Sequence, residues 1–81
     1  MRFENKIAVV TGGGVGIGRA ICERLASEGA SIVVAEIEED NGAETAQALE
    51  ASGSQALFCR TDTSDSASVA AMVAAATERF G

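Results

Sequence analysis

The sequence predicts an α/β fold, namely half of a doubly wound parallel sheet with the element order β-α-β-α-β-α and the strand order 3-2-1. Three short apolar runs alternate with segments of helical periodicity, as in parallel strands joined by right-handed helical crossovers. The runs are apolar without alternation, as expected for strands buried on both faces. A glycine-rich turn follows the first run, and the 81 residues suffice for one small domain at most.

The first predicted strand is Lys6–Thr11, and the first predicted helix is Gly16–Glu28. In this helix Ile17, Ile21 and Leu25 recur at positions i, i+4 and i+8, with Ala20 and Cys22 flanking them. We expect these residues to form one apolar stripe.

The rest of the chain repeats the alternation. Ser31–Glu36 and Gln55–Arg60 are the second and third predicted strands. A mostly exposed helix is expected over about residues 40–51, and a last helix over about 65–80 with Ser64 as its N-cap.

Composition narrows the possible partners. The net charge of −6 argues against nucleic-acid binding, and no apolar run approaches the roughly 20 residues of a membrane span. Cys22 and Cys59 lack CxxC spacing and the first residues do not resemble a secretory leader. We therefore expect reduced thiols in a cytoplasmic protein, without a disulfide or metal site.

The glycine-rich turn is the segment Thr11-Gly12-Gly13-Gly14-Val15-Gly16-Ile17-Gly18. A strand, a glycine turn and a helix in this order favour binding of a dinucleotide pyrophosphate at the helix N-terminus. A simple tight turn is the alternative, although one or two glycines would suffice for it. The spacing is neither G-x-G-x-x-G nor a P-loop, since Arg19-Ala20 stands where the P-loop has Lys-Ser/Thr. What remains is Thr-Gly-x-x-x-Gly-x-Gly.

That pattern resembles the cofactor loop of the short-chain dehydrogenase/reductase family. The resemblance covers essentially the whole chain and is carried by four blocks: 6–20, 29–36, 60–65 and 78–81. It implies that residues 1–81 are the N-terminal NAD-binding half of a Rossmann domain.

The resemblance also implies that the loop holds the ribose and pyrophosphate mainly through its backbone, at Gly12, Gly14, Val15, Gly16, Ile17 and Gly18. Gly12 would form the tight turn, Gly16 would let the backbone approach the cofactor, and Gly18 would let the helix pack closely on the strand. Arg19 is expected to be a solvated helix residue.

Glu36 is a second indication, independent of the family. It ends an apolar strand about 20 residues beyond the loop, where an acidic side chain accepts hydrogen bonds from the adenosine ribose. The same carboxylate repels a 2′-phosphate, and no basic residue stands beside it: Ile37 follows, then Glu38–Asp40. We therefore predict NAD in preference to NADP, with Glu36 and Ile37 in the site. The alternative is an ordinary acidic start to the next helix.

Asp62 and Thr63 follow the third predicted strand. The resemblance implies that Asp62 lies near the adenine amino group, with Thr63 beside it. Without the resemblance, Asp62 would be an ordinary loop aspartate.

Catalytic residues are not predicted. The family uses a Tyr-x-x-x-Lys pair, whereas this chain has no tyrosine and no histidine, and its only lysine, Lys6, precedes the first strand. We expect the NAD-binding N-terminal segment, roughly the first third, of an NAD-dependent alcohol/carbonyl oxidoreductase that is not catalytic alone.

Two other functions stay open: a free-standing nucleotide-binding or interaction module without enzymatic activity, and a binder of another nucleotide or of S-adenosylmethionine.

In addition, the first strand should be central in a complete sheet. Its outer edge should be unpaired here, so we expect self-association.

Overall fold

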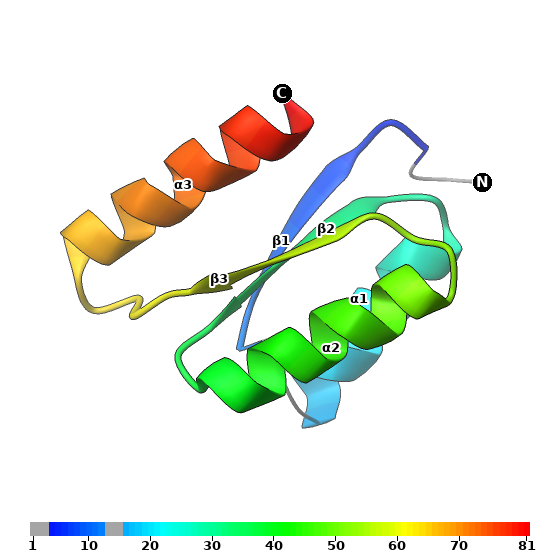
Figure 1. Cartoon of the computed structure of the whole chain (residues 1–81), viewed down its shortest axis with the longest axis horizontal. Helices are drawn as coiled ribbons and strands as arrows, with labels where there is room; N and C mark the ends of the chain where they lie inside the picture. The colour runs from blue at the N-terminus through cyan, green and yellow to red at the C-terminus, as the bar shows by residue number, and fades with distance from the viewer. Residues whose placement is uncertain (1–3, 13–15) are drawn as a thin grey trace.

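The computed structural model describes residues 4–12 and 16–81 and confirms the predicted fold class (Figure 1). The element order is β1 (Ile7–Thr11), α1 (Gly16–Ser27), β2 (Ser31–Glu36), α2 (Glu39–Ala51), β3 (Ala56–Arg60) and α3 (Ser66–Phe80). The three strands are parallel and lie in the order β1-β2-β3. Helices α1 and α2 cover one face of the sheet, and α3 covers the other.

Strand β2 is the centre of the molecule. Val33 pairs with Val9 of β1 on one side and with Leu57 of β3 on the other. Every residue from Ile32 to Glu36 is buried, as the apolar run without alternation predicts. The element that carries Glu36 is therefore fixed by neighbours on both edges and both faces.

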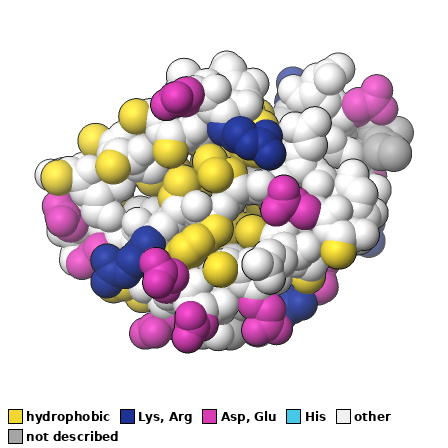
Figure 2. Space-filling view, viewed as in Figure 1, with side chains coloured by type: hydrophobic (Ala, Val, Ile, Leu, Met, Phe, Trp, Pro, Cys, Tyr) yellow, Lys and Arg dark blue, Asp and Glu magenta, His cyan; other side chains and the backbone are white. Residues whose placement is uncertain are grey.

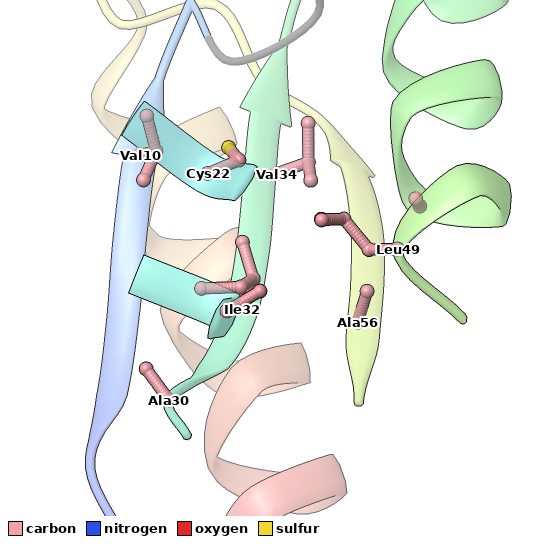
Figure 3. Close-up of a cluster of buried hydrophobic side chains, with 9 residues drawn as sticks. Val10, Cys22, Ala30, Ile32, Val34, Leu49 and Ala56 are labelled. Atoms are coloured by element: carbon pink, nitrogen blue, oxygen red, sulfur yellow. The ribbon is translucent and has the colours of Figure 1, made fainter. Parts of the chain in front are cut away.

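The larger core lies between the sheet and helices α1 and α2 (Figure 3). Its buried residues are mostly small or β-branched: Val10, Cys22, Ala26, Ala30, Ile32, Val34, Ala46, Leu49 and Ala56. A smaller core under α3 contains Val33, Ala35, Met72 and Ala76. Small side chains let the helices lie close to the sheet. This close approach leaves no voids between the two layers, as the dense packing of protein interiors requires.

The predicted apolar stripe of α1 is correct for Leu25 and the flanking Cys22 and wrong for the two isoleucines. Cys22 and Ala26 are the buried residues of this helix, and Leu25 is half-buried against the core. In contrast, Ile17 is 81% exposed and Ile21 is 45% exposed. The helix turns its small residues to the sheet, which shortens the distance between helix and sheet, and leaves its two isoleucines on another side.

Arg19 is also placed differently from the expected solvated residue. Its Nη1 lies 3.3 Å from Glu44 Oε1 on α2, and its Nε lies 3.8 Å from Glu23 on its own helix. The side chain of Arg19 therefore bridges α1 and α2. Since the pair is partly exposed, its contribution to stability is small, about 0–1 kcal/mol.

Gly42 lets α2 lie directly on the sheet. A Cβ at this position would overlap the ring of Phe58 on β3 and would come within 3.1 Å of Glu36 Cβ on β2. Glycine is unfavourable inside a helix, so the close approach of backbone to ring explains its presence. The expected mostly exposed helix thus has a buried side, made of Gly42, Thr45, Ala46 and Leu49.

The N-cap of α3 is Asp65, and the prediction of Ser64 is wrong. The Asp65 carboxylate accepts a hydrogen bond from the Ala67 N–H at 3.0 Å. Ser64 is engaged elsewhere, because both its N–H and its hydroxyl donate to Asp62 Oδ1.

The outer edge of β1 is bordered by exposed apolar side chains on both faces of the sheet. Ile7 and Val9 form a shallow groove of about 230 Å³ with Met72, Val73 and Ala76 of α3. On the opposite face Arg19 and Glu23 of α1 face α2, so Ile17 and Ile21 lie on the flank of α1 that is turned towards this edge. Hydrophobic side chains are also visible around α3 in the space-filling view (Figure 2). Among residues 4–12 and 16–81, no helix is long and apolar enough to cross a bilayer.

Replacing Gly42 by alanine should lower the free energy of unfolding by about 1–3 kcal/mol, because the added methyl group overpacks the Phe58 ring. This would outweigh the gain in helix propensity of up to about 1 kcal/mol. Urea denaturation followed by circular dichroism measures the effect.

Gln47→Ala, at an exposed position of the same helix, is the control and should change stability by less than about 0.5 kcal/mol. The double variant G42A/F58L should lose less than the sum of the two single changes. A stabilising G42A substitution would contradict the packing argument.

Candidate cofactor-binding site

The residues singled out from the sequence meet at the carboxyl edge of the sheet. Two backbone hydrogen bonds join the segments that leave the three strands: Gly12 N donates to Ala35 O at 2.8 Å, and Thr61 N donates to Glu36 O at 3.0 Å. The glycine turn, the end of β2 and the segment after β3 are thereby held side by side. In open α/β sheets ligands bind at this edge.

The described part of the glycine turn leaves open space above the sheet. Gly12 and Gly16 have positive φ angles of 67° and 58°, which other residues rarely adopt. A Cβ on either would meet no atom of the described residues within 4 Å, so these residues leave space for a ligand in front of the backbone. Gly18, in the first turn of α1, is half-buried, and Ile17 is exposed. Gly14 and Val15 lie outside the described residues.

Glu36 is a buried carboxylate, only 8% exposed. Its Oε2 accepts hydrogen bonds from the backbone N–H groups of Ile37 at 3.0 Å and of Glu38 at 3.2 Å. A buried charge needs such donors, since an unsatisfied carboxylate would be strongly destabilising. The two bonds fix the carboxylate at the strand end, next to the exposed Ile37.

Asp62 organises the segment between β3 and α3. Its Oδ1 accepts from the Ser64 hydroxyl at 2.6 Å and from the Ser64 N–H at 3.0 Å. Its own N–H donates to Ser68 Oγ at 2.9 Å. The hydrogen bonds from Ser64, followed by the charge of Arg60, lower the pKa of the Asp62 carboxyl. Asp62 is half-buried and Thr63 is exposed.

Three residues of this region were missed by the sequence analysis. Ser64 and Ser68 hold Asp62 through contacts that span two and six positions, and a serine-rich stretch does not reveal which hydroxyl is used. Arg60 is the in-register partner of Glu36 on the adjacent strand. The expectation that no basic residue stands beside Glu36 is therefore wrong, because the chain brings one there through sheet pairing.

A groove of about 730 Å³ lies elsewhere on the described surface. It is at the amino edge of the sheet, between the C-terminal ends of α1 and α2, and residues such as Glu4, Ser27, Gly53 and Gln55 line it. Helix C-termini carry partial negative charge, which disfavours a phosphate. None of the predicted cofactor residues lines this groove.

Among the described residues, neither Cys22 nor Cys59 forms a disulfide bond. Burial raises the pKa of the Cys22 thiol, helped by the charge of Glu23, and burial also raises the pKa of Cys59. These thiols are therefore protonated at neutral pH. Among the described residues, no group of three or more His, Cys, Asp and Glu side chains could hold a metal ion.

The chemistry of the carboxyl edge fits the adenosine end of a dinucleotide. A free helix N-terminus can donate to phosphate oxygens, and the Glu36 carboxylate can accept from ribose hydroxyls. The open space at Gly12 and Gly16 lets a ligand reach the backbone. Among the described residues, this edge has no histidine or tyrosine that could move a proton at neutral pH.

Comparison with known proteins gives a consistent result. The family model described as short chain dehydrogenase matches residues 6–81. A short-chain dehydrogenase/reductase of Aspergillus oryzae, astE, is 52% identical over 80 residues, which are 98% of this chain and 31% of that protein. An uncharacterized oxidoreductase of Thermotoga maritima is 45% identical over 79 residues, 98% of this chain and 31% of that protein.

Two solved structures match the fold of this chain closely. A short-chain dehydrogenase/reductase from Burkholderia phymatum in complex with NAD has a TM-score of 0.95 at 43% identity, over 100% of this chain and 29% of that chain. A hydroxysteroid dehydrogenase from Escherichia coli has a TM-score of 0.95 at 34% identity, over 99% and 33%. This chain thus spans about a third of the length of the proteins that it matches.

Ser64→Ala should raise the pKa of Asp62 towards its ordinary value, because the Ser64 hydroxyl is the main cause of its lowering. Carboxyl-detected NMR titration measures this. A carboxyl whose folded pKa is lowered stabilises the fold above its unfolded pKa and loses that contribution as the pH falls through the folded pKa. The variant should therefore be less stable than the wild type at neutral pH, and the difference should shrink in acid.

Ser66→Ala, at the exposed start of α3, is the matched control and should leave the pKa of Asp62 unchanged. An unchanged pKa in the Ser64 variant would show that its hydroxyl does not hold the carboxylate.

Proposed function

We propose that this chain, which belongs to the short-chain dehydrogenase/reductase family, holds the adenosine end of NAD at the carboxyl edge of its sheet. The proposed contacts are the backbone of the glycine turn, the Glu36–Ile37 segment and the Asp62–Thr63 segment. The relative from Burkholderia phymatum was solved with NAD, which supports a nicotinamide dinucleotide as the ligand.

The observation that carries the proposal is the position of Glu36. Its carboxylate is buried at the end of the central strand, fixed by two backbone N–H groups, and joined to the glycine turn through the bond from Gly12 N to Ala35 O. A fixed carboxylate can accept hydrogen bonds from both ribose hydroxyls without reorganising. Glycine turn and acceptor are thus presented to one ligand.

NAD rather than NADP is proposed for electrostatic reasons. A 2′-phosphate would replace a hydrogen-bond donor by an anion directly at Glu36, and Glu38, Glu39 and Asp40 add negative charge at the start of α2. Because Glu36 is buried, its repulsion is screened less than that of the exposed acids.

NAD should bind the chain at least about tenfold more tightly than NADP at low ionic strength, since a charged contact is worth about 1.5–3 kcal/mol. Calorimetric titration, or NMR chemical-shift titration where binding is weak, measures both affinities. Raising the salt concentration should narrow the difference. The control variant Glu50→Gln, which removes an exposed acid near the far end of α2, should keep the preference. Tighter binding of NADP would contradict the proposed role of Glu36.

The activity proposed for the whole protein is NAD-dependent alcohol/carbonyl oxidoreduction, with this chain as its cofactor-binding N-terminal segment. When bound, NAD supplies the hydride acceptor or donor. The residues described here would hold the adenosine half, and other residues must position the nicotinamide and transfer the proton. We therefore propose that the 81 residues are not catalytic alone. We also propose that the protein acts in the cytoplasm.

A free-standing nucleotide-binding or interaction module is the second candidate. The DNA that follows codon 81 separates the two: a continuing frame with Asn-Ala-Gly and a later Tyr-x-x-x-Lys supports the oxidoreductase segment. An authentic stop codon, together with a folded soluble 81-residue product, supports the module.

We also propose that the chain self-associates through the outer edge of β1. An unpaired strand edge bordered by Ile7, Val9 and Val73 offers both hydrogen-bonding groups and apolar surface to a second copy. Sedimentation velocity should show a concentration-dependent dimer. Val9→Lys should abolish it, because like charges would meet across the edge. Gln47→Lys on the exposed side of α2 adds the same charge and should preserve the dimer. A wild-type monomer at all concentrations would refute this proposal.

A further inference from the structure

We infer that Arg60 is a specificity-determining residue of the adenosine site, placed to receive a 2′-phosphate when the charge of Glu36 is removed. The inference rests on the proposed function, since it requires that the adenosine ribose lies at Glu36. It adds a second residue, from a different strand, to the choice between NAD and NADP.

The register of the sheet places Arg60 beside Glu36. The two residues are paired on adjacent parallel strands, where strands are about 5 Å apart. Val34 of β2 and Phe58 of β3 both pack on the core under α1 and α2, whereas Ala35 and Cys59 pack on the core under α3. Because side chains alternate along a strand, Glu36 and Arg60 both point to the α2 side.

The Arg60 guanidinium forms no ion pair or hydrogen bond within the described part of the chain, although its charge helps to lower the pKa of the Asp62 carboxyl. Arg19 and Arg24 are in ion pairs with glutamates, and Arg79 lies over the Phe80 ring at 5.0 Å. No described residue forms an ion pair or hydrogen bond with Arg60, and its side chain is exposed.

Arginine is the side chain best suited to a phosphate, because its planar fork of N–H groups matches the oxygens of the anion. A phosphate on the ribose 2′-oxygen would lie where Glu36 otherwise accepts the hydroxyl, within one strand spacing of Arg60. In the wild type the buried carboxylate opposes the phosphate, and Arg60 only partly offsets it. Once Glu36 is neutral, the charge of Arg60 is no longer opposed by a carboxylate at the paired position of the neighbouring strand.

Glu36→Gln is the substitution that isolates this effect. The glutamine amide oxygen can still accept from the N–H groups of Ile37 and Glu38, so the strand end keeps its structure while its negative charge is lost. AMP and adenosine 2′,5′-bisphosphate are suitable probes, because they differ only in the 2′-phosphate and need no nicotinamide half. Binding to the chain is followed by NMR chemical-shift titration at low salt.

The wild type should bind AMP at least about tenfold more tightly than the bisphosphate. E36Q should reverse that order, and E36Q/R60A should lose about tenfold in affinity for the bisphosphate while its affinity for AMP changes little. E36Q/R24A removes the same charge from the other end of the molecule, where Arg24 pairs with Glu28 in the last turn of α1. It should bind the bisphosphate as E36Q does.

The inference is overturned if R60A in the E36Q background leaves the affinity for the bisphosphate unchanged, or if R24A weakens it equally. Those results leave binding of AMP and NAD intact, so they are distinct from a failure of the proposed function. If the wild type binds neither AMP nor NAD, the proposed function fails and the inference falls with it.

Discussion

The burial of β2 is the constraint on which the rest of this structure depends. A strand enclosed by β1, β3 and helices on both faces cannot end in an acidic side chain unless that side chain is satisfied locally. Glu36 meets this condition by folding back on the N–H groups of Ile37 and Glu38. The backbone of the turn into α2 therefore also fixes the position of the Glu36 carboxylate. Gly42 contributes to the same arrangement, because α2 can follow this turn only if its backbone lies against Phe58 and Glu36. Stability and ligand chemistry are combined at the same strand end.

The fold was largely predictable from the sequence, because apolar runs without alternation and helical segments differ in period. The orientation of α1 was not. A stripe of isoleucines predicts the buried side of a helix only if the helix has one apolar neighbour, whereas α1 turns Cys22 and Ala26 to the sheet and its isoleucines to another side. Small residues give little hydrophobic contrast, yet they permit the closest approach. The cap of α3 was missed for a similar reason. Ser64 and Asp65 are both good caps, and the turn around Asp62 already uses Ser64.

The positions of the candidate site residues in the sequence were predictable. The contacts between residues that lie far apart in the sequence were not. Glycine spacing and an acid at a strand end are local patterns, so Gly12 and Glu36 were identified, and both lie at the carboxyl edge. Arg60 is 24 positions from Glu36, and only the register of β2 and β3 makes them neighbours. The electrostatic character of the candidate site therefore depends on strand pairing. A one-residue slip would turn Arg60 to the opposite face, so the register specifies the charge environment as well as the core.

The two edge strands of the sheet, β1 and β3, differ in the exposed apolar side chains that lie around them. Apart from Ile37, the large exposed apolar side chains of the described residues, namely Ile7, Val9, Ile17, Ile21 and Val73, lie around β1, and none lies along β3. An additional strand would therefore bury more apolar surface by pairing with β1 than by pairing with β3. A strand added at β1 would cover both groups of side chains from one side, whereas β3, the other edge strand, carries no large exposed apolar side chain. The edge of β1 is thus the place where an additional strand of any origin would bury the most apolar surface on this sheet.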